Sequence, residues 1–73
     1  MDWHKSISNI RFFKAIKEGD VANFAKILDQ YPDFIDQKAS DGWTPLETAY
    51  FNGQAEIIRH LHYIIGKSQS YQK

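Results

Sequence analysis

The chain has 73 residues, of which 42% are hydrophobic and 15% aromatic, so it is too short for two domains and too apolar for a disordered segment. Its nine basic and nine acidic residues leave no net charge to direct it toward nucleic acid, and it has no cysteine for a disulfide or a thiolate zinc site. We expect one domain over 1–66 with a polar C-terminal tail over 67–73. Without a long apolar stretch or a signal peptide, we also expect a cytoplasmic protein that does not bind membranes.

The first half of the sequence predicts a pair of helices. Over residues 7–18 the apolar positions recur every three or four residues, which is typical of a helix that ends at Gly19. Ser6 or Ser8 would cap its start. A second periodic segment follows over 21–30 and stops before Pro32, because proline disfavours helical backbone at the residue that precedes it. The pattern indicates helix, tight turn and helix.

The second half predicts a loop and another pair of helices. Residues 32–43 are rich in turn-forming residues, with Phe34 and Ile35 as apolar anchors. Thr44-Pro45 then opens a helix, with threonine as the cap and proline at the first helical position. That helix runs to Gly53, and a last helix ends near Gly66.

The chain matches itself when it is shifted by 34 residues. The superposed pairs are Phe12 and Leu46, Ala15 and Ala49, Gly19 and Gly53, Phe24 and Ile58, and Ile27 and Leu61. A unit of about 33 residues with two antiparallel helices and a Thr-Pro-Leu-His-x-Ala start is the ankyrin pattern. The segment Thr44-Pro45-Leu46-Glu47-Thr48-Ala49 is similar to that start. The chain therefore resembles a two-repeat ankyrin protein, with repeats at about 9–40 and 41–66.

The resemblance implies an all-α fold of stacked antiparallel helix pairs with finger loops, and a protein–protein interaction module that works without catalysis. Such a small module would act on one partner, for example as an inhibitor or an antitoxin-like neutraliser. One position departs from the family pattern, because Glu47 stands where the family has a histidine that ties neighbouring turns together.

The resemblance also indicates which residues would contact a partner. In the ankyrin family these are the turn tips and one face of the first helix of each repeat. The matching positions are Ser40, Asp41, Trp43, Tyr50, Phe51 and Asn52 in the second repeat, and Lys17 and Glu18 in the first. Aromatic residues would supply most of the binding energy. Alternatively, Trp43 lies over the neighbouring turn while Tyr50 and Phe51 fill the space of a missing repeat.

The last helix carries more apolar residues than one preceding helix pair can cover. Tyr63, Ile64 and Ile65 are the candidates for self-association, and a second copy of the chain would then complete the stack. The alternative is that the terminal segments fold back, with Trp3 and Ile7 covering one end.

No motif in the sequence points to catalysis, a metal or a cofactor. His60 and His62 are two residues apart, so on a helix they face different directions and cannot share one metal ion. No glycine-rich phosphate loop or nucleophile constellation occurs. Arg11, Lys14 and Lys17 share one side of the first helix, but with a pI near 6.8 we expect no nucleic-acid binding.

Overall fold

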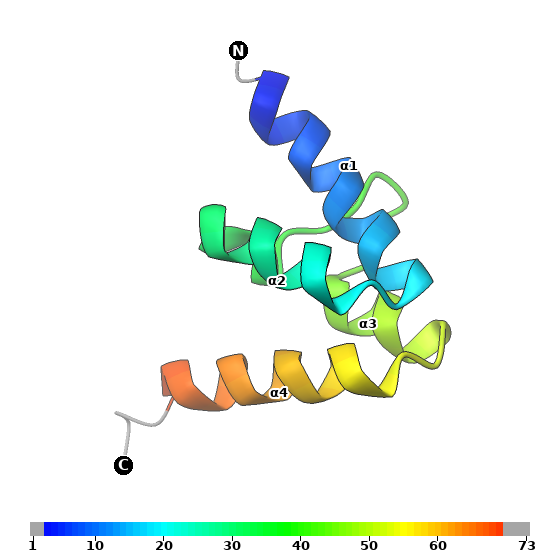
Figure 1. Ribbon diagram of the computed structural model, residues 1–73, viewed down its shortest axis with the longest axis vertical. Coiled ribbons are helices and arrows are strands. Elements are labelled where there is room, and N and C mark those ends of the chain that lie inside the picture. Colours follow the sequence, from blue (N-terminus) through cyan, green and yellow to red (C-terminus); the bar gives the residue numbers. More distant parts are fainter. Residues whose placement is uncertain (1–2, 70–73) are drawn as a thin grey trace.

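The computed structural model describes residues 3–69, and within this range all the regular secondary structure is helical, with no strand. The all-α class predicted from the sequence is confirmed. The elements in chain order are α1 (Trp3–Glu18), α2 (Val21–Gln30), the short 3-10 helix η1 (Pro32–Asp36), α3 (Pro45–Phe51) and α4 (Ala55–Gln69). Figure 1 shows α2 and α3 between the C-terminal half of α1 and α4, while the N-terminal half of α1 extends beyond the other helices.

Within each helix pair a turn joins the two helices, and the two turns have the same geometry. Gly19 and Gly53 both have a positive φ, +74° and +65°, a backbone conformation in which a side chain would be strained. In each turn the residue after the glycine donates its N–H to the carbonyl of the alanine that lies four residues before the glycine. These bonds reach Ala15 at 2.8 Å and Ala49 at 3.0 Å. The period of 34 residues therefore recurs in the backbone geometry.

A side chain also ties the two turns to each other. Gln54 Nε2 donates to the backbone carbonyl of Lys17 at 2.8 Å, across 37 residues of sequence. The Gln54 amide lies where a Cβ on Gly19 would be, because such an atom would come within 2.6 Å of Gln54 Oε1. Glycine at residue 19 thus suits both the positive φ of its turn and the place that the Gln54 amide takes beside it.

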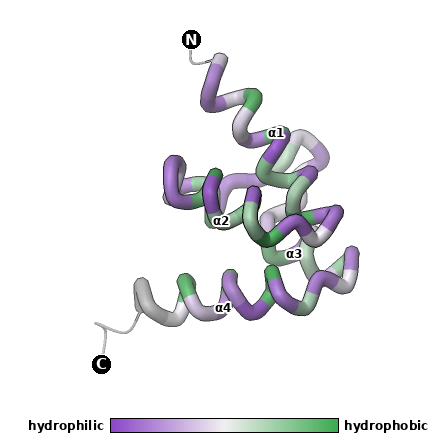
Figure 2. The backbone as a smooth tube through the Cα atoms, in the orientation of Figure 1, coloured by the Kyte–Doolittle hydropathy of each residue, from purple (hydrophilic) through white to green (hydrophobic). Residues whose placement is uncertain are grey.

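The core is built around four phenylalanines. The ring of Phe12 lies 5.3–5.6 Å, between centroids, from the rings of Phe13, Phe24 and Phe34. Phe34, on η1, is fully buried, as the sequence predicts for an anchor of this loop. The other buried hydrophobic residues are Ala15, Ile16, Leu28, Ala49, Ile57 and Leu61. Figure 2 shows hydrophobic and hydrophilic stretches alternating along α4, as in a helix with one buried face.

The start of α3 is fixed by a reciprocal pair of hydrogen bonds. Thr44 Oγ1 accepts from the Glu47 N–H at 3.1 Å, and Glu47 Oε1 accepts from the Thr44 N–H at 3.0 Å. Pro45 occupies the first turn and is buried. The predicted Thr-Pro start is confirmed. The Glu47 carboxylate bonds to the start of its own helix.

Two helix boundaries differ from the prediction. α1 begins at Trp3 instead of near Ile7, so Ser6 and Ser8 lie inside the helix and do not cap it. α4 continues through Gly66 to Gln69, because Gly66 does not adopt the left-handed φ that would end the helix. Of the predicted polar tail, residues 70–73 lie outside the described residues.

The first two turns of α1 do not fold back over the core. Trp3 is 69% exposed and Ile7 45% exposed. The interpretation in which these two residues cover one end of the domain is therefore wrong. No helix among residues 3–69 is long and apolar enough to cross a membrane.

Candidate functional site

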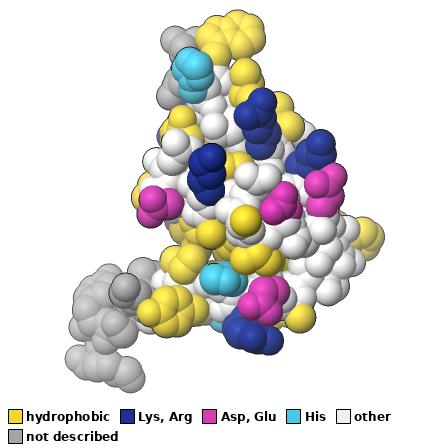
Figure 3. Space-filling view, viewed as in Figure 1, with side chains coloured by type: hydrophobic (Ala, Val, Ile, Leu, Met, Phe, Trp, Pro, Cys, Tyr) yellow, Lys and Arg dark blue, Asp and Glu magenta, His cyan; other side chains and the backbone are white. Residues whose placement is uncertain are grey.

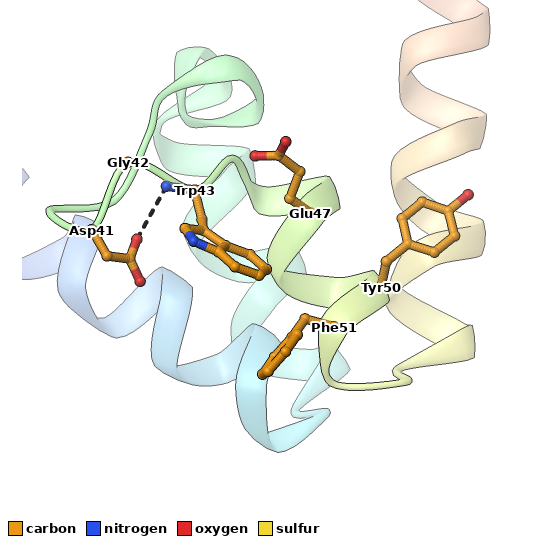
Figure 4. A pocket seen from close by; sticks show the side chains of 6 residues that line it. All are labelled: Asp41, Gly42, Trp43, Glu47, Tyr50 and Phe51. Atoms are coloured by element: carbon orange, nitrogen blue, oxygen red, sulfur yellow. Dashed lines mark hydrogen bonds between the residues drawn. The ribbon is translucent and has the colours of Figure 1, made fainter.

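Trp43 and Phe51 form an exposed aromatic pair beside α3, which we call the aromatic ridge. Trp43 comes from the loop before α3 and Phe51 is the last residue of α3 (Figure 4). Their ring centroids are 5.1 Å apart and the rings meet edge to face at 77°. Trp43 is 39% exposed and Phe51 is 77% exposed. Most of the Phe51 side chain is therefore open to a partner.

The loop holds Trp43 in place through its backbone. The Trp43 N–H donates to Asp41 Oδ1 at 3.1 Å, which Figure 4 marks as a dashed line. The Trp43 carbonyl accepts from the Ala39 N–H at 2.8 Å, and the Ala39 carbonyl accepts from the Gly42 N–H at 2.9 Å. Gly42 permits this tight turn with a φ of +87°. These bonds fix the backbone from which the indole projects.

Two adjoining hollows share the aromatic ridge. The larger, about 640 Å³, is the aromatic hollow, lined by Asp41, Gly42, Trp43, Glu47, Tyr50 and Phe51. The smaller, about 370 Å³, is lined by Lys17, Asp41, Trp43, Thr48, Phe51 and Asn52. Six of the eight residues predicted to contact a partner therefore line one continuous surface.

The other two predicted residues lie elsewhere. Glu18 lines a polar hollow between α1 and α2. Because consecutive residues on a helix point about 100° apart, it cannot share the direction of Lys17. Ser40 is exposed in the turn beside Asp41 and lines neither hollow of the ridge.

Tyr50 is oriented differently from its neighbour Phe51. Figure 4 shows its side chain directed toward α4. The Tyr50 hydroxyl lies 2.7 Å from His62 Nε2, and the two rings meet edge to face with centroids 6.0 Å apart. Tyr50 therefore closes the side of the aromatic hollow nearest α4 and joins α3 to that helix.

Glu47 gives the aromatic hollow a negative charge. The pKa of Glu47 lies below its ordinary value of 4.5, chiefly because its carboxylate accepts the Thr44 backbone N–H, with smaller contributions from the Thr44 side chain and from Lys38. At neutral pH Glu47 is ionised. Its Oε1 atom accepts the bond that fixes the helix start, so Oε2 is the atom available to a ligand.

The residues predicted for self-association do not form one exposed cluster. Tyr63 is 67% exposed, but Ile64 packs against the core and lines a groove between α2 and α4. Ile65 is half-buried. Because these three residues are consecutive on α4, their side chains point in different directions.

A different apolar face was not identified from the sequence. Trp3, Ile7 and Ile10 lie on one side of α1, and Ile10 is 70% exposed. Their spacing of four and three residues is the helical signal that reveals this face. The apolar period of the sequence predicts one buried stripe for this helix, whereas the structure leaves this second face exposed.

The basic residues of α1 are divided between two surfaces. Arg11 and Lys14 line the polar hollow between α1 and α2 together with Lys26, whereas Lys17 lines the smaller hollow of the aromatic ridge. Figure 3 shows dark-blue side chains over α1 and α2 with magenta side chains close by, so the positive charge on this face is partly offset. No group of three or more metal-ligating side chains occurs within residues 3–69.

Comparisons with known proteins give one partial similarity. No protein-family model and no solved structure matches the chain. The chain is 35% identical over 51 residues to proteins named NAD-capped RNA hydrolase NUDT12 from Homo sapiens, Pongo abelii and Macaca fascicularis. The matched segment covers 70% of this chain but 11% of each hydrolase. The chain thus corresponds to a small part of those proteins.

Proposed function

We propose that the chain is a non-catalytic, ankyrin-type module that binds one partner protein through the aromatic ridge and its two hollows. The observation that carries the proposal is the position of Trp43 at the surface, where its N–H bonds to the Asp41 side chain, its carbonyl accepts from Ala39 and its ring contacts Phe51. A large aromatic side chain that is both exposed and fixed loses little conformational entropy when a partner covers it. Such residues dominate the energies of protein interfaces.

The repeated geometry of the turns supports the ankyrin-type assignment. Gly19 and Gly53 occupy equivalent positions 34 residues apart, and Gln54 links their turns. The helix α3 starts at Thr44-Pro45, as the resemblance implies, although the Glu47 that completes its capping box departs from the family pattern. In this arrangement the loop tip before α3 and the end of α3 form the edge that faces a partner.

The size of the domain supports the mode of action. The Cα positions span 38 × 28 × 23 Å, which leaves room for one recognition surface of ordinary area. The module therefore acts by occupying a partner's surface, as an inhibitor or an antitoxin-like neutraliser does. Because the match to the capped-RNA hydrolases covers 11% of their length, the activity in their name is not assigned to this chain.

Capture of a partner followed by calorimetry tests the proposal. Wild-type protein and the Trp43→Ala variant serve as parallel baits, and a protein retained only by the wild type is then titrated with Trp43→Ala, Phe51→Ala and Lys17→Ala. Each aromatic truncation should weaken binding about thirty-fold or more, whereas Lys17→Ala should cost less and act mainly on the association rate. If both aromatic variants fold and bind like the wild type while Lys17→Ala is the most damaging, the ridge is not the binding surface.

A second candidate is self-association, in which another copy completes the stack of helices. It is favoured by the exposed apolar face of Trp3, Ile7 and Ile10 on the protruding half of α1. Light scattering after size exclusion separates the candidates. A dimer that dissociates in the Ile10→Lys variant, with helix content unchanged, would support self-association through α1. A wild type that is monomeric at high concentration would exclude it.

Substitutions on α4 test whether that helix carries the self-association surface. Because Ile64 packs against the core, Ile64→Lys should destabilise the fold instead of only separating copies. Tyr63→Lys changes the exposed side of the same helix and leaves the core intact. A dimer lost with Tyr63→Lys but not with Ile10→Lys would place the self-association surface on α4.

A further inference from the structure

The lining of the aromatic hollow combines aromatic faces with negative charge. Trp43, Tyr50 and Phe51 supply the aromatic surface, while Asp41 and Glu47 supply two carboxylates. No lysine or arginine is among the lining residues. An aromatic surface beside carboxylates, without a cation of its own, is complementary to a positively charged side chain.

We infer that the aromatic hollow binds an arginine side chain from a basic segment of the partner protein. The inference rests on the proposed function and names the chemistry of the partner at this surface. The guanidinium group would stack on the indole of Trp43 and donate hydrogen bonds to Asp41 and Glu47.

Arginine fits this lining better than lysine does. Its planar guanidinium has five N–H donors and is weakly hydrated, so it can stack on an aromatic ring and bond to carboxylates at the same time. The carboxylate of Asp41 uses Oδ1 for the Trp43 N–H and that of Glu47 uses Oε1 for the Thr44 N–H. Each therefore retains one oxygen, and a forked donor can reach two separate acceptors where a single ammonium group cannot easily do so.

The cations nearest the hollow do not occupy it. Lys17 lines the smaller hollow on the other side of the ridge. Lys38 lies close enough to contribute, as the smallest cause, to the lowered pKa of Glu47, but it is not part of the lining. Asp41 lines both hollows and so shares the smaller one with Lys17, whereas Glu47 lines only the aromatic hollow, which has no lysine or arginine in its lining.

The two carboxylates can be neutralised without disturbing the loop or the helix start. Asp41→Asn keeps a side-chain oxygen that accepts the Trp43 N–H. Glu47→Gln keeps the capping box, which glutamine supports as well as glutamate. Asp29→Asn is the matched control, because Asp29 is an exposed carboxylate that lines the groove between α2 and α4.

The probes are short Gly-Ser peptides that carry one central arginine, lysine, citrulline or norleucine. Citrulline has nearly the shape of arginine but no charge, so it isolates the contribution of charge. Binding is followed by the NMR shift of the Trp43 indole N–H in the Trp3→Phe background, which leaves a single tryptophan signal.

We expect a saturable shift with the arginine peptide and weaker binding of the lysine peptide. The citrulline peptide should bind at least about five-fold more weakly than the arginine peptide. Asp41→Asn and Glu47→Gln should each weaken arginine binding about two- to five-fold, which corresponds to a solvent-exposed ion pair. Asp29→Asn should leave it unchanged.

Three outcomes would overturn the inference. The first is equal binding of the citrulline and arginine peptides, and the second is an equal effect of Asp29→Asn and Glu47→Gln. The third is self-association of the chain that depends on Asp41 and Glu47, because the occupant would then be a second copy. If the inference fails while a captured partner still requires Trp43, the proposed function stands and only the chemistry of the partner is wrong.

Discussion

Replacing Ala49 by leucine tests the packing on which the repeat assignment depends. Ala49 is fully buried, and its helix α3 packs against both α1 and α4. Leucine adds three carbon atoms at a position with no exposed surface, so neighbouring helices must move apart. Overpacking of this kind costs about 1–3 kcal/mol. For a domain of this size each kcal/mol lowers the Tm by about 4–8 °C, so we expect a decrease of about 5–20 °C.

The matched control is Ala22→Leu, the same substitution at an exposed position of α2. Alanine and leucine have similar helix propensities, so this variant should change the stability by less than about 0.5 kcal/mol. Thermal unfolding followed by circular dichroism measures both. If the two variants melt at the same temperature within error, Ala49 is not at a close helix contact, and the argument from its small size is refuted.

Three further predictions concern the core, the start of α3 and pH. Phe12→Ala should destabilise the domain by about 3–5 kcal/mol, because its ring contacts three other phenylalanines, and a variant with the wild-type Tm would contradict this. Thr44→Ala should lower the free energy of unfolding, measured in urea, by about 0.5–2 kcal/mol, whereas Thr44→Ser should lower it little. Equal decreases for the two variants would show that the capping hydroxyl is not the cause. The folded-state pKa of Glu47 is lowered, so its contribution is fully present above its ordinary pKa of 4.5 and is lost as the pH falls below that value. Glu47→Gln should therefore lose less stability than the wild type as the pH falls. Some loss should remain, because Lys5 lowers the pKa of Asp33 and so gives that residue a pH dependence of the same direction. Parallel curves of stability against pH for the two proteins would refute this prediction.

Local signals in the sequence predicted the parts of the fold that short-range chemistry determines. The start of α3 at Thr44-Pro45 needs only a capping side chain and the fixed φ of proline. The turns at Gly19 and Gly53 need only glycine after an amphipathic helix. Gly66 shows the limit of this reasoning. A glycine permits a helix to end but does not force it to, and α4 continues through this residue.

The direction of side chains depends on tertiary contacts that the sequence does not display. Tyr50 and Phe51 are adjacent on α3, yet Tyr50 meets His62 on α4 whereas Phe51 meets Trp43 on the loop. Six of the eight residues predicted from the resemblance line the two hollows of the ridge, and whether they bind a partner stays a prediction. The eight also included Glu18, which helix geometry separates from Lys17.

Photo-crosslinking from residue 51 tests most directly the claim that the aromatic ridge is the partner-binding surface. Benzoylphenylalanine placed at Phe51 is close in shape to the native side chain and lies on the ridge. The same group at Tyr63, which is similarly exposed but lies on α4, is the control. Irradiation in cells should join residue 51, and not residue 63, to one protein of a different mass. Adducts from residue 63 alone, or adducts at twice the mass of the chain from either position, would contradict the account.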